Sequence, residues 1–253
     1  MLAAVSEGWR AVFLLGAGLG AGLVNGLAGG GTLASFPVLL AIGVPALGAN
    51  VTSTVGIWPG YLGGSGGFRH EISDQRAKLT ELAPVAVAGA VAGAVLLIVT
   101  PGDAFSHAAP YLLLLSCALF CAQPLLARRL AASPGRRRWL VAQAGTLVAC
   151  AYGSYFGAGL GVLLLAVLGI ALPDSLVRTN GLRSVLSLGV NAVAAIAFMV
   201  GADVRWGYAG LLAISSLVGG YLGARLARRM PAAPFRVVVI LVGLAAAARL
   251  LAG

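Results

Sequence analysis

Two glycine-rich interruptions of apolar sequence constrain the fold of this chain more than any other feature. The first covers residues 22–32, and a shorter form of it recurs 130 positions later within residues 155–161. The apolar segment after each of them, 31–44 and 159–173, has only about 14 residues, and a helix of that length spans roughly 21 Å at 1.5 Å per residue. The core of a lipid bilayer is about 30 Å thick. The pattern therefore predicts a broken helix in each half of the chain, buried in protein or lining a cavity.

The composition shows which solvent surrounds these segments. Charged residues make up 9% and hydrophobic residues 60% of the 253 residues, whereas a soluble domain carries about a quarter of its residues as charges. Because so few charges cannot cover a water-exposed surface, we predict one integral membrane domain over residues 1–253. The predicted fold class is an all-α polytopic membrane protein with 8–10 spans, the lower count applying if the short segments are re-entrant. Its ten apolar segments cover residues 11–28, 31–44, 49–67, 80–99, 110–127, 138–156, 159–173, 183–201, 207–224 and 235–251.

The chain is also duplicated. A shift of 130 positions pairs Gly29 with Gly159, and further Gly, Asn and Pro positions pair under the same shift without a gap. We therefore predict two repeats, at about 11–127 and about 138–251. A duplicated unit with a broken helix in each half is typical of secondary transporters, whose site lies near the bilayer midplane between the repeats.

The placement of arginine indicates how the repeats are oriented. The loops 68–79, 128–138 and 225–236 carry three, five and four basic residues, and cytoplasmic loops are enriched in Lys and Arg. With these loops in the cytoplasm, each repeat crosses five times, an odd number, so the repeats are inverted and both termini lie outside. The same loops account for the net charge of +10, so no nucleic-acid partner is expected.

Six stretches in the two halves form a pattern that resembles a known family. They are residues 26–32, 37, 43–45, 49–53, 157–161 and 179–180. This pattern looks like the TauE/SafE-type sulfite exporter family, also called the toluene-sulfonate uptake permeases, although the second copy lacks the triple glycine. The resemblance extends over essentially the whole chain. It implies a multi-pass transporter of the bacterial inner membrane that moves sulfite, an organosulfonate or a related small anion.

The glycine motif has a chemical interpretation of its own. Glycines 29–31 expose backbone N–H groups, and a short helix starting near Thr32 would direct its positive end at the break, which suits an anion. The alternative is that these glycines only allow close helix packing. We prefer the packing interpretation for the GxxxG pairs at 89/93 and 219/223, and the functional one for the repeated break.

Arg183 is the most informative single residue. It stands at the start of the segment 183–201 with no acidic residue within eight positions, and its planar fork suits a sulfonate, sulfite or carboxylate. The alternative is an arginine that extends to the membrane boundary. The full set of predicted substrate-binding residues is Asn25, Gly29, Gly30, Gly31, Thr32, Asn50, Thr52, Ser53, Gly157, Gly159, Gly161, Asn180, Arg183 and Ser184. Secondary candidates are Tyr152, Ser154, Tyr155, Ser187 and Asn191.

The residues that several other functions require are absent from this sequence. No Asp or Glu lies mid-span, Glu81 and Asp174 lie at segment edges, and the glycine motif lacks the lysine of a phosphate-binding loop. We expect no enzyme activity, cofactor or metal. The remaining alternatives are a permease for another small anion or polar metabolite, a thiol-redox conduit through Cys117 and Cys121, and an assembly subunit. A homo-oligomer is compatible with the sequence.

Overall fold

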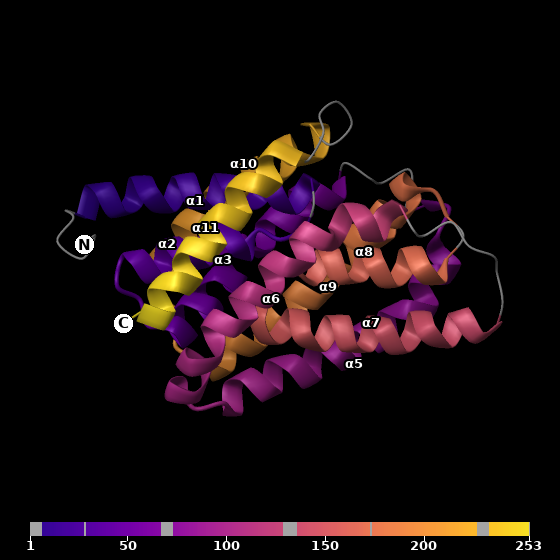
Figure 1. Ribbon diagram of the computed structural model, residues 1–253, viewed down its shortest axis with the longest axis horizontal. Coiled ribbons are helices and arrows are strands. Elements are labelled where there is room, and N and C mark those ends of the chain that lie inside the picture. The colour runs from indigo at the N-terminus through magenta and orange to yellow at the C-terminus, as the bar shows by residue number, and fades with distance from the viewer. Residues whose placement is uncertain are drawn as a thin grey trace.

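The computed structural model describes residues 7–27, 29–66, 73–128, 136–172, 174–226 and 233–252, and all regular secondary structure in these ranges is helical (Figure 1). The predicted all-α polytopic fold is thus confirmed. Each predicted apolar segment coincides with one helix, although α6 and α9 begin eight and seven residues earlier than predicted. The helices are α1 (Glu7–Leu27), α2 (Thr32–Ala41), α3 (Ala46–Gly66), α5 (Arg76–Val99), α6 (Gly102–Arg128), α7 (Arg136–Phe156), α8 (Leu160–Ala171), α9 (Leu176–Gly201), α10 (Trp206–Leu226) and α11 (Ala233–Ala252).

Helix lengths separate the membrane-spanning elements from the short ones. The helices α2 and α8, which follow the glycine motifs, have only 10 and 12 residues. Large apolar side chains such as Val95, Val200 and Ile214 are exposed on the outer faces of long helices, where lipid is the compatible solvent. Five described helices are long and apolar enough to span a membrane: Gly8–Leu27, Arg76–Val99, Gly102–Ala122, Arg178–Gly201 and Trp206–Leu226.

The two halves of the chain run in opposite directions. The helix α1 starts at the end of the molecule where α11 finishes, whereas α7 starts at the opposite end (Figure 1). We call these the terminal end and the arginine-rich end. The predicted cytoplasmic loops 68–79, 128–138 and 225–236 lie partly outside the described residues, so the cytoplasmic assignment of the arginine-rich end stays a prediction.

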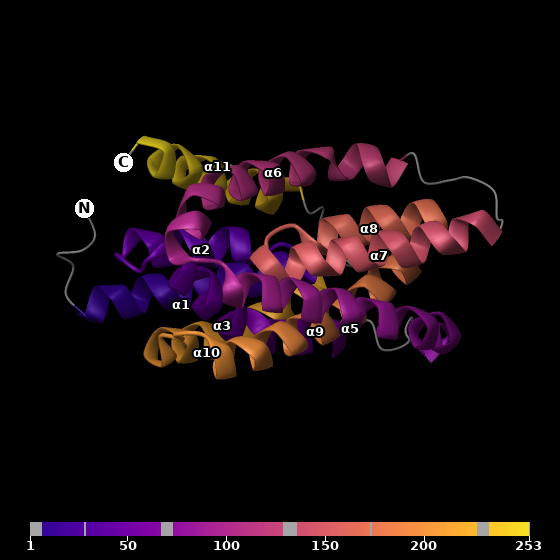
Figure 2. The ribbon, with the colours of Figure 1, turned by 90° about the horizontal axis from the view of Figure 1, so that it is seen from below.

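Helix contacts repeat between the halves. The helix α1 packs on α10 as α7 packs on α5, and α3 packs on α10 as α9 packs on α5. The helices α3 and α9, and likewise α6 and α11, are paired by the 130-residue shift and contact each other. Figure 2 shows α6 and α11 together along one face of the molecule and α10 at the opposite face. The halves are therefore interlocked, with the α3–α9 contact at their centre.

Small residues permit the closest of these contacts. A Cβ on Gly223 of α10 would lie 2.6 Å from the Leu23 carbonyl oxygen of α1, and one on Gly89 of α5 would lie 3.1 Å from the Cys150 Cβ of α7. Helix backbones touch at such positions, as is common between membrane helices. The packing interpretation of the two GxxxG pairs is confirmed.

Candidate functional site

Each predicted break is a turn that requires glycine. Between α1 and α2, Gly29 has a φ of 76°, and between α7 and α8, Gly157 and Gly159 have φ values of 77° and 91°. These left-handed conformations carry a steric penalty for any residue with a Cβ. Gly31 and Gly159 are the N-caps of α2 and α8. The glycine runs therefore end one helix and begin the next within a few residues.

The structure brings the two breaks into direct contact. A Cβ on Gly161 would lie 2.6 Å from the Gly29 Cα, and one on Gly157 would lie 2.9 Å from the Thr32 hydroxyl oxygen. All the glycines of both breaks are buried. We call this contact region the crossing, defined by residues 29–32 and 157–161. The start of α2 at Thr32 and the start of α8 at Leu160 are therefore neighbours in space, although they lie in opposite halves of the chain.

Both short helices begin at the crossing without a side-chain cap on their first turn. The Gly31 N–H, which precedes α2, donates to the Asn25 side-chain oxygen at 2.6 Å. The first N–H groups of a helix carry a partial positive charge. Two such helix ends therefore add positive potential to one buried region.

Arg183 contributes a full positive charge to the same region. It lies seven positions inside α9, because the helix begins at Leu176, and it is only 2% exposed. The interpretation that it extends to the membrane boundary is therefore wrong. A Cβ on Gly29 would lie 3.1 Å from the guanidinium carbon, so the guanidinium packs against the first break. Its Nε and Nη1 atoms have no hydrogen-bond partner among the described residues.

Arg183 belongs to a buried polar stripe along α9. Thr179, Arg183, Ser187 and Asn191 follow at intervals of four residues, and each is at most 2% exposed. Residues at this spacing share one face of a helix. The Asn191 side-chain nitrogen donates to the Ser187 carbonyl at 2.9 Å. The helix α9 thus turns a polar face toward the centre of the molecule.

Tyr61 of α3, which our sequence analysis missed, completes this polar region. Its side chain is 4% exposed, and its hydroxyl lies near the Arg183 guanidinium and the side-chain amides of Asn25 and Asn191. The 130-residue shift pairs Tyr61 with Asn191. A search for polar residues at both positions of a repeat pair would have found it.

The predicted polar residues of α3 have other partners. The Asn50 side-chain nitrogen donates to the Tyr155 carbonyl at 2.9 Å, beside the second break. Ser53 shares a 2.6 Å hydrogen bond with Ser35 of α2, and the Thr52 hydroxyl accepts from the Arg205 N–H at 3.1 Å. Asn50 and Ser53 therefore hold the short-helix regions in place, whereas Thr52 binds the connection between α9 and α10.

Asn180 and Ser184, two further predicted binding residues, lie on α9. Asn180 is half-buried near the start of the helix. The Ser184 hydroxyl is 3.3 Å from that of Ser65 in α3. The residues that the structure gathers at the crossing are Asn25, Gly29, Gly30, Gly31, Thr32, Gly157, Gly159, Gly161 and Arg183, joined by Tyr61.

Cys117 and Cys121, the pair considered for redox transfer, lie in different environments. Cys117 is buried in α6, with its Sγ 3.8 Å from the Ile240 carbonyl oxygen, whereas Cys121 is exposed. Both thiols are free. Their spacing of four residues therefore does not place them together in a shared buried site.

Comparison with known proteins places this geometry in a family. The family model described as "Sulfite exporter TauE/SafE" matches residues 14–250. This chain belongs to that family. It is also 26% identical over 245 residues to a protein of Sinorhizobium sp. named "Probable membrane transporter protein ORF9", an alignment that covers 95% of this chain and 92% of the relative.

The family and the helical fold together identify a membrane transporter. As a TauE/SafE protein with five candidate spans among its described helices, the chain is a multi-pass protein of the bacterial inner membrane. The motif resemblance predicted this family, and the family match confirms it. The crossing is the part of this transporter that combines a helix break from each half with a buried charge.

Proposed function

We propose that this TauE/SafE transporter carries a small anion, most directly sulfite or an organosulfonate, and binds it at the crossing beside Arg183. The observation that carries the proposal is the buried Arg183 guanidinium, two of whose nitrogens have no partner among the described residues. Arg183 is 2% exposed, and its Nε and Nη1 atoms lack hydrogen-bond partners in the part of the chain that the structure describes. A buried charge without a counter-ion is strongly unfavourable, and a bound anion would relieve this penalty.

The geometry of the donors fits an oxyanion. A guanidinium presents parallel N–H groups that match two oxygens of one sulfite, sulfonate or carboxylate group. The Asn25 side-chain nitrogen and the Thr32 hydroxyl, both buried, also lack partners, and they flank the start of α2. The site therefore offers one full charge, two helix ends and neutral donors to a compact anion.

The family match supports sulfite or a sulfonate over other small anions. The matching model is named for sulfite export, and sulfite and sulfonates share the same three-oxygen group. Another small anion with two or three oxygens on one centre would satisfy the same donors. A polar metabolite without charge would leave Arg183 without a counter-ion.

Transport would proceed by alternating access around the crossing. The two halves run in opposite directions and contribute one break each. In inverted-repeat transporters, one half rocks against the other around a fixed midplane site. The crossing lies where such a movement would expose the anion first to one side and then to the other.

Uptake of labelled sulfite into proteoliposomes tests the proposal, with Arg183→Gln as the variant and Arg225→Gln as its control. Loss of a charge-assisted bond should weaken apparent affinity by about 1.5–3 kcal/mol, or roughly 10- to 150-fold. Arg225 is exposed on α10, where its guanidinium lies over the Tyr221 ring, so its variant should change affinity much less. Uptake is measured at several membrane potentials.

Thermal unfolding separates a binding defect from a folding defect. A ligand that binds only the folded protein raises its Tm, so sulfite should stabilise the parent and Arg225→Gln but not Arg183→Gln. Removing an unpartnered buried charge should not lower the Tm of the free protein. Equal sulfite uptake by Arg183→Gln and the parent, or a preference for a cation, would overturn the anion site.

A further inference from the structure

A pocket of about 400 Å³ opens at the terminal end of the molecule. Its walls include Pro45, Gly48 and Val51 at the start of α3, and Asp203 and Arg205 between α9 and α10. Val51 adjoins Asn50, whose side chain bonds the Tyr155 carbonyl beside the second break. The pocket wall and the contact with the second break are therefore formed by neighbouring residues of α3.

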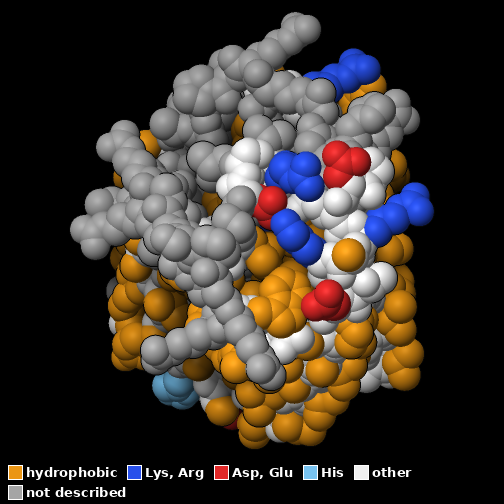
Figure 3. Space-filling view, turned by 90° about the vertical axis from the view of Figure 1, so that its right-hand side faces the viewer, with side chains coloured by type: hydrophobic (Ala, Val, Ile, Leu, Met, Phe, Trp, Pro, Cys, Tyr) orange, Lys and Arg blue, Asp and Glu red, His pale blue; other side chains and the backbone are white. Residues whose placement is uncertain are grey.

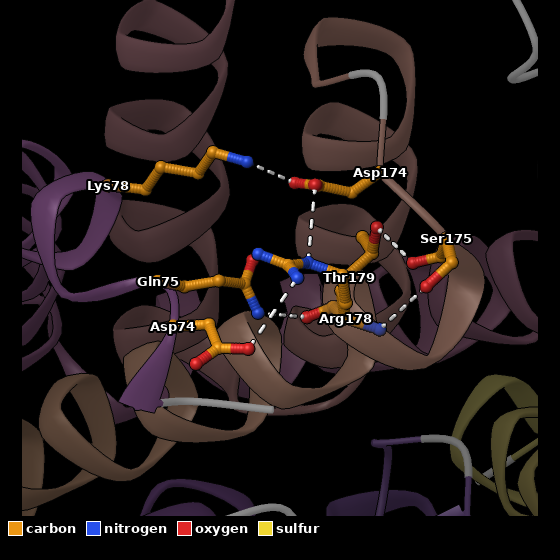
Figure 4. A network of polar contacts seen from close by, with 7 residues as sticks. All are labelled: Asp74, Gln75, Lys78, Asp174, Ser175, Arg178 and Thr179. Carbon is orange, nitrogen blue, oxygen red and sulfur yellow. Dashed lines mark hydrogen bonds and ion pairs between the residues drawn. The ribbon is translucent and has the colours of Figure 1, made fainter. Parts of the chain in front are cut away.

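An ion-pair network occupies the opposite, arginine-rich end (Figure 4). The Asp174 carboxylate lies 2.5 Å from the Lys78 Nζ and 3.6 Å from the Arg178 Nε, and the Arg178 Nη1 lies 3.8 Å from Asp74. The Gln75 side-chain nitrogen donates to the Arg178 carbonyl at 2.9 Å. Figure 3 shows charged side chains of both signs gathered on this end, among apolar ones.

The network joins the two halves over the polar stripe of α9. Asp74, Gln75 and Lys78 come from the first half, whereas Asp174 and Arg178 come from the second. Arg178 directly precedes Thr179, the first buried residue of the stripe. The bonds between the halves therefore cover the stripe where it approaches the arginine-rich end.

The pocket and the network occupy equivalent places in the inverted halves. The 130-residue shift that relates the halves pairs the network residue Arg178 with the pocket residue Gly48. It also pairs Asp174 with Val44. An ion-paired arginine therefore fills one end where a glycine leaves space at the other. The counterparts of Asp74 and Lys78 are likewise uncharged, and they are Val204 and Tyr208.

We infer that the pocket is the open vestibule for the anion and that the Lys78–Asp174–Arg178 network is the closed gate at the other end of the same path. This inference rests on the proposed transport function. Ion pairs between the halves stabilise the arrangement that is closed at the arginine-rich end. In the opposite arrangement these pairs separate, and the walls around Gly48 come together. Because the pairs are partly exposed and each is weak, thermal motion can open them.

Thiol labelling tests the gate without any substrate. In a chain whose native cysteines are replaced by Ser or Ala, Gly48→Cys reports on the vestibule and Thr179→Cys on the space behind the gate. A Cβ at Gly48 would meet only the Val44 Cγ1, at 3.5 Å, so the thiol fits. The probe is a charged, membrane-impermeant methanethiosulfonate, applied to protein in lipid nanodiscs so that both ends are accessible.

The decisive comparison adds Asp174→Asn to each reporter, since this change removes the acceptor of both Lys78 and Arg178. We expect labelling of Gly48→Cys to slow at least threefold and labelling of Thr179→Cys to accelerate at least threefold. Lys78→Gln, which breaks one pair only, should shift both rates in the same directions by less. Asp103→Asn, which changes an exposed carboxylate of α6 outside the network, should shift neither.

The outcomes distinguish the gate from the anion site. Unchanged rates at both reporters in Asp174→Asn and Lys78→Gln would overturn the gate while leaving the Arg183 proposal intact. Labelling of Gly48→Cys no faster than that of buried Thr179→Cys in the otherwise unaltered cysteine-free chain would overturn the vestibule. If sulfite does not bind but the labelling rates of the two reporters shift in opposite directions, the anion site is overturned and the gate is supported.

Discussion

The two helix breaks occupy equivalent places in the inverted halves, yet they are built differently. At the first break, a Cβ on Gly29 would meet both Arg183 and Gly161, and one on Gly30 would overlap the Phe120 ring. At the second, a Cβ on Gly159 would find only ordinary contacts of 3.5–3.7 Å. Gly29 is therefore crowded against a charge, whereas its counterpart Gly159 has room, although Gly157 and Gly161 of the second break also lie close against the first.

Hydrogen bonds show the same contrast. Around the second break, Asn50 and Ser116 donate to the Tyr155 and Ala158 carbonyls at 2.9 and 3.0 Å. Around the first, Asn25 accepts from the Gly31 N–H while its own nitrogen lacks a partner. Among the described residues, the Asn50 and Ser116 donors beside the second break are bonded, although the Asn50 side-chain oxygen has no partner, whereas the first break retains unpartnered donors that a ligand can use.

The difference in charge between the two breaks can be traced to one pair of equivalent positions in the two halves. The 130-residue shift pairs Ser53 of α3 with Arg183 of α9. Ser53 bonds Ser35 at 2.6 Å, a neutral contact, whereas Arg183 brings an unpartnered charge to Gly29. The broken helix thus occurs in both halves, whereas the charge occurs in one.

The largest difference is expected between alanine substitutions at Gly29 and Gly159. Both would strain a left-handed residue by about 1–2 kcal/mol, but Gly29→Ala adds overlap with Arg183 and Gly161, for a total of about 2–5 kcal/mol. We expect a much lower Tm and loss of sulfite uptake for Gly29→Ala. Gly43→Ala, with a φ of 92° and open space around it, controls for strain alone. Equal damage at Gly159 and Gly29 would remove the contrast in crowding.

A smaller, functional difference is expected between Asn25→Asp and Asn50→Asp. The new carboxylate at position 25 can still accept from the Gly31 N–H and lies in the region of Tyr61 and Arg183, so it would compete with an anion. We expect sulfite to lose most of its stabilising effect on Tm, while the free protein keeps its stability.

Asn50→Asp should show the opposite behaviour. It loses the donor to the Tyr155 carbonyl, at a cost of about 1–3 kcal/mol, so the Tm of the free protein should fall while the sulfite-induced shift persists. Calorimetric or fluorescence unfolding with and without sulfite measures both variants. A retained sulfite shift in Asn25→Asp would argue that the first break is not the anion site.

The smallest effect is expected from Ser116→Ala. It removes the donor to the Ala158 carbonyl and the 2.8 Å contact with the Tyr152 hydroxyl. We expect a loss of about 0.5–1.5 kcal/mol in stability, seen as a modest drop in Tm, with sulfite uptake nearly unchanged. Ser106→Ala, whose exposed hydroxyl bonds only its own helix, serves as control. A large loss of uptake would show that the second break also binds substrate.

Most of the fold could be predicted from the sequence because it depends on local pattern. Apolar segment lengths distinguish the short helices α2 and α8 from the spans, and glycine runs indicate where each helix breaks. The start of α9 was missed because Thr179 and Asn180 interrupt the apolar pattern without interrupting the helix. That error placed Arg183 at a boundary, although the helix carries it to the interior.

The sequence by itself determined the membrane solvent and the positions of the breaks, since each follows from neighbouring residues. Only the tertiary structure decided that the breaks touch, that Arg183 packs against Gly29, and that Tyr61 lies beside it. It also decided that Lys78 pairs with Asp174. These contacts join residues from opposite halves of the chain, and their energies depend on distance and burial, which the interlocked packing of α3, α5 and α9 alone provides.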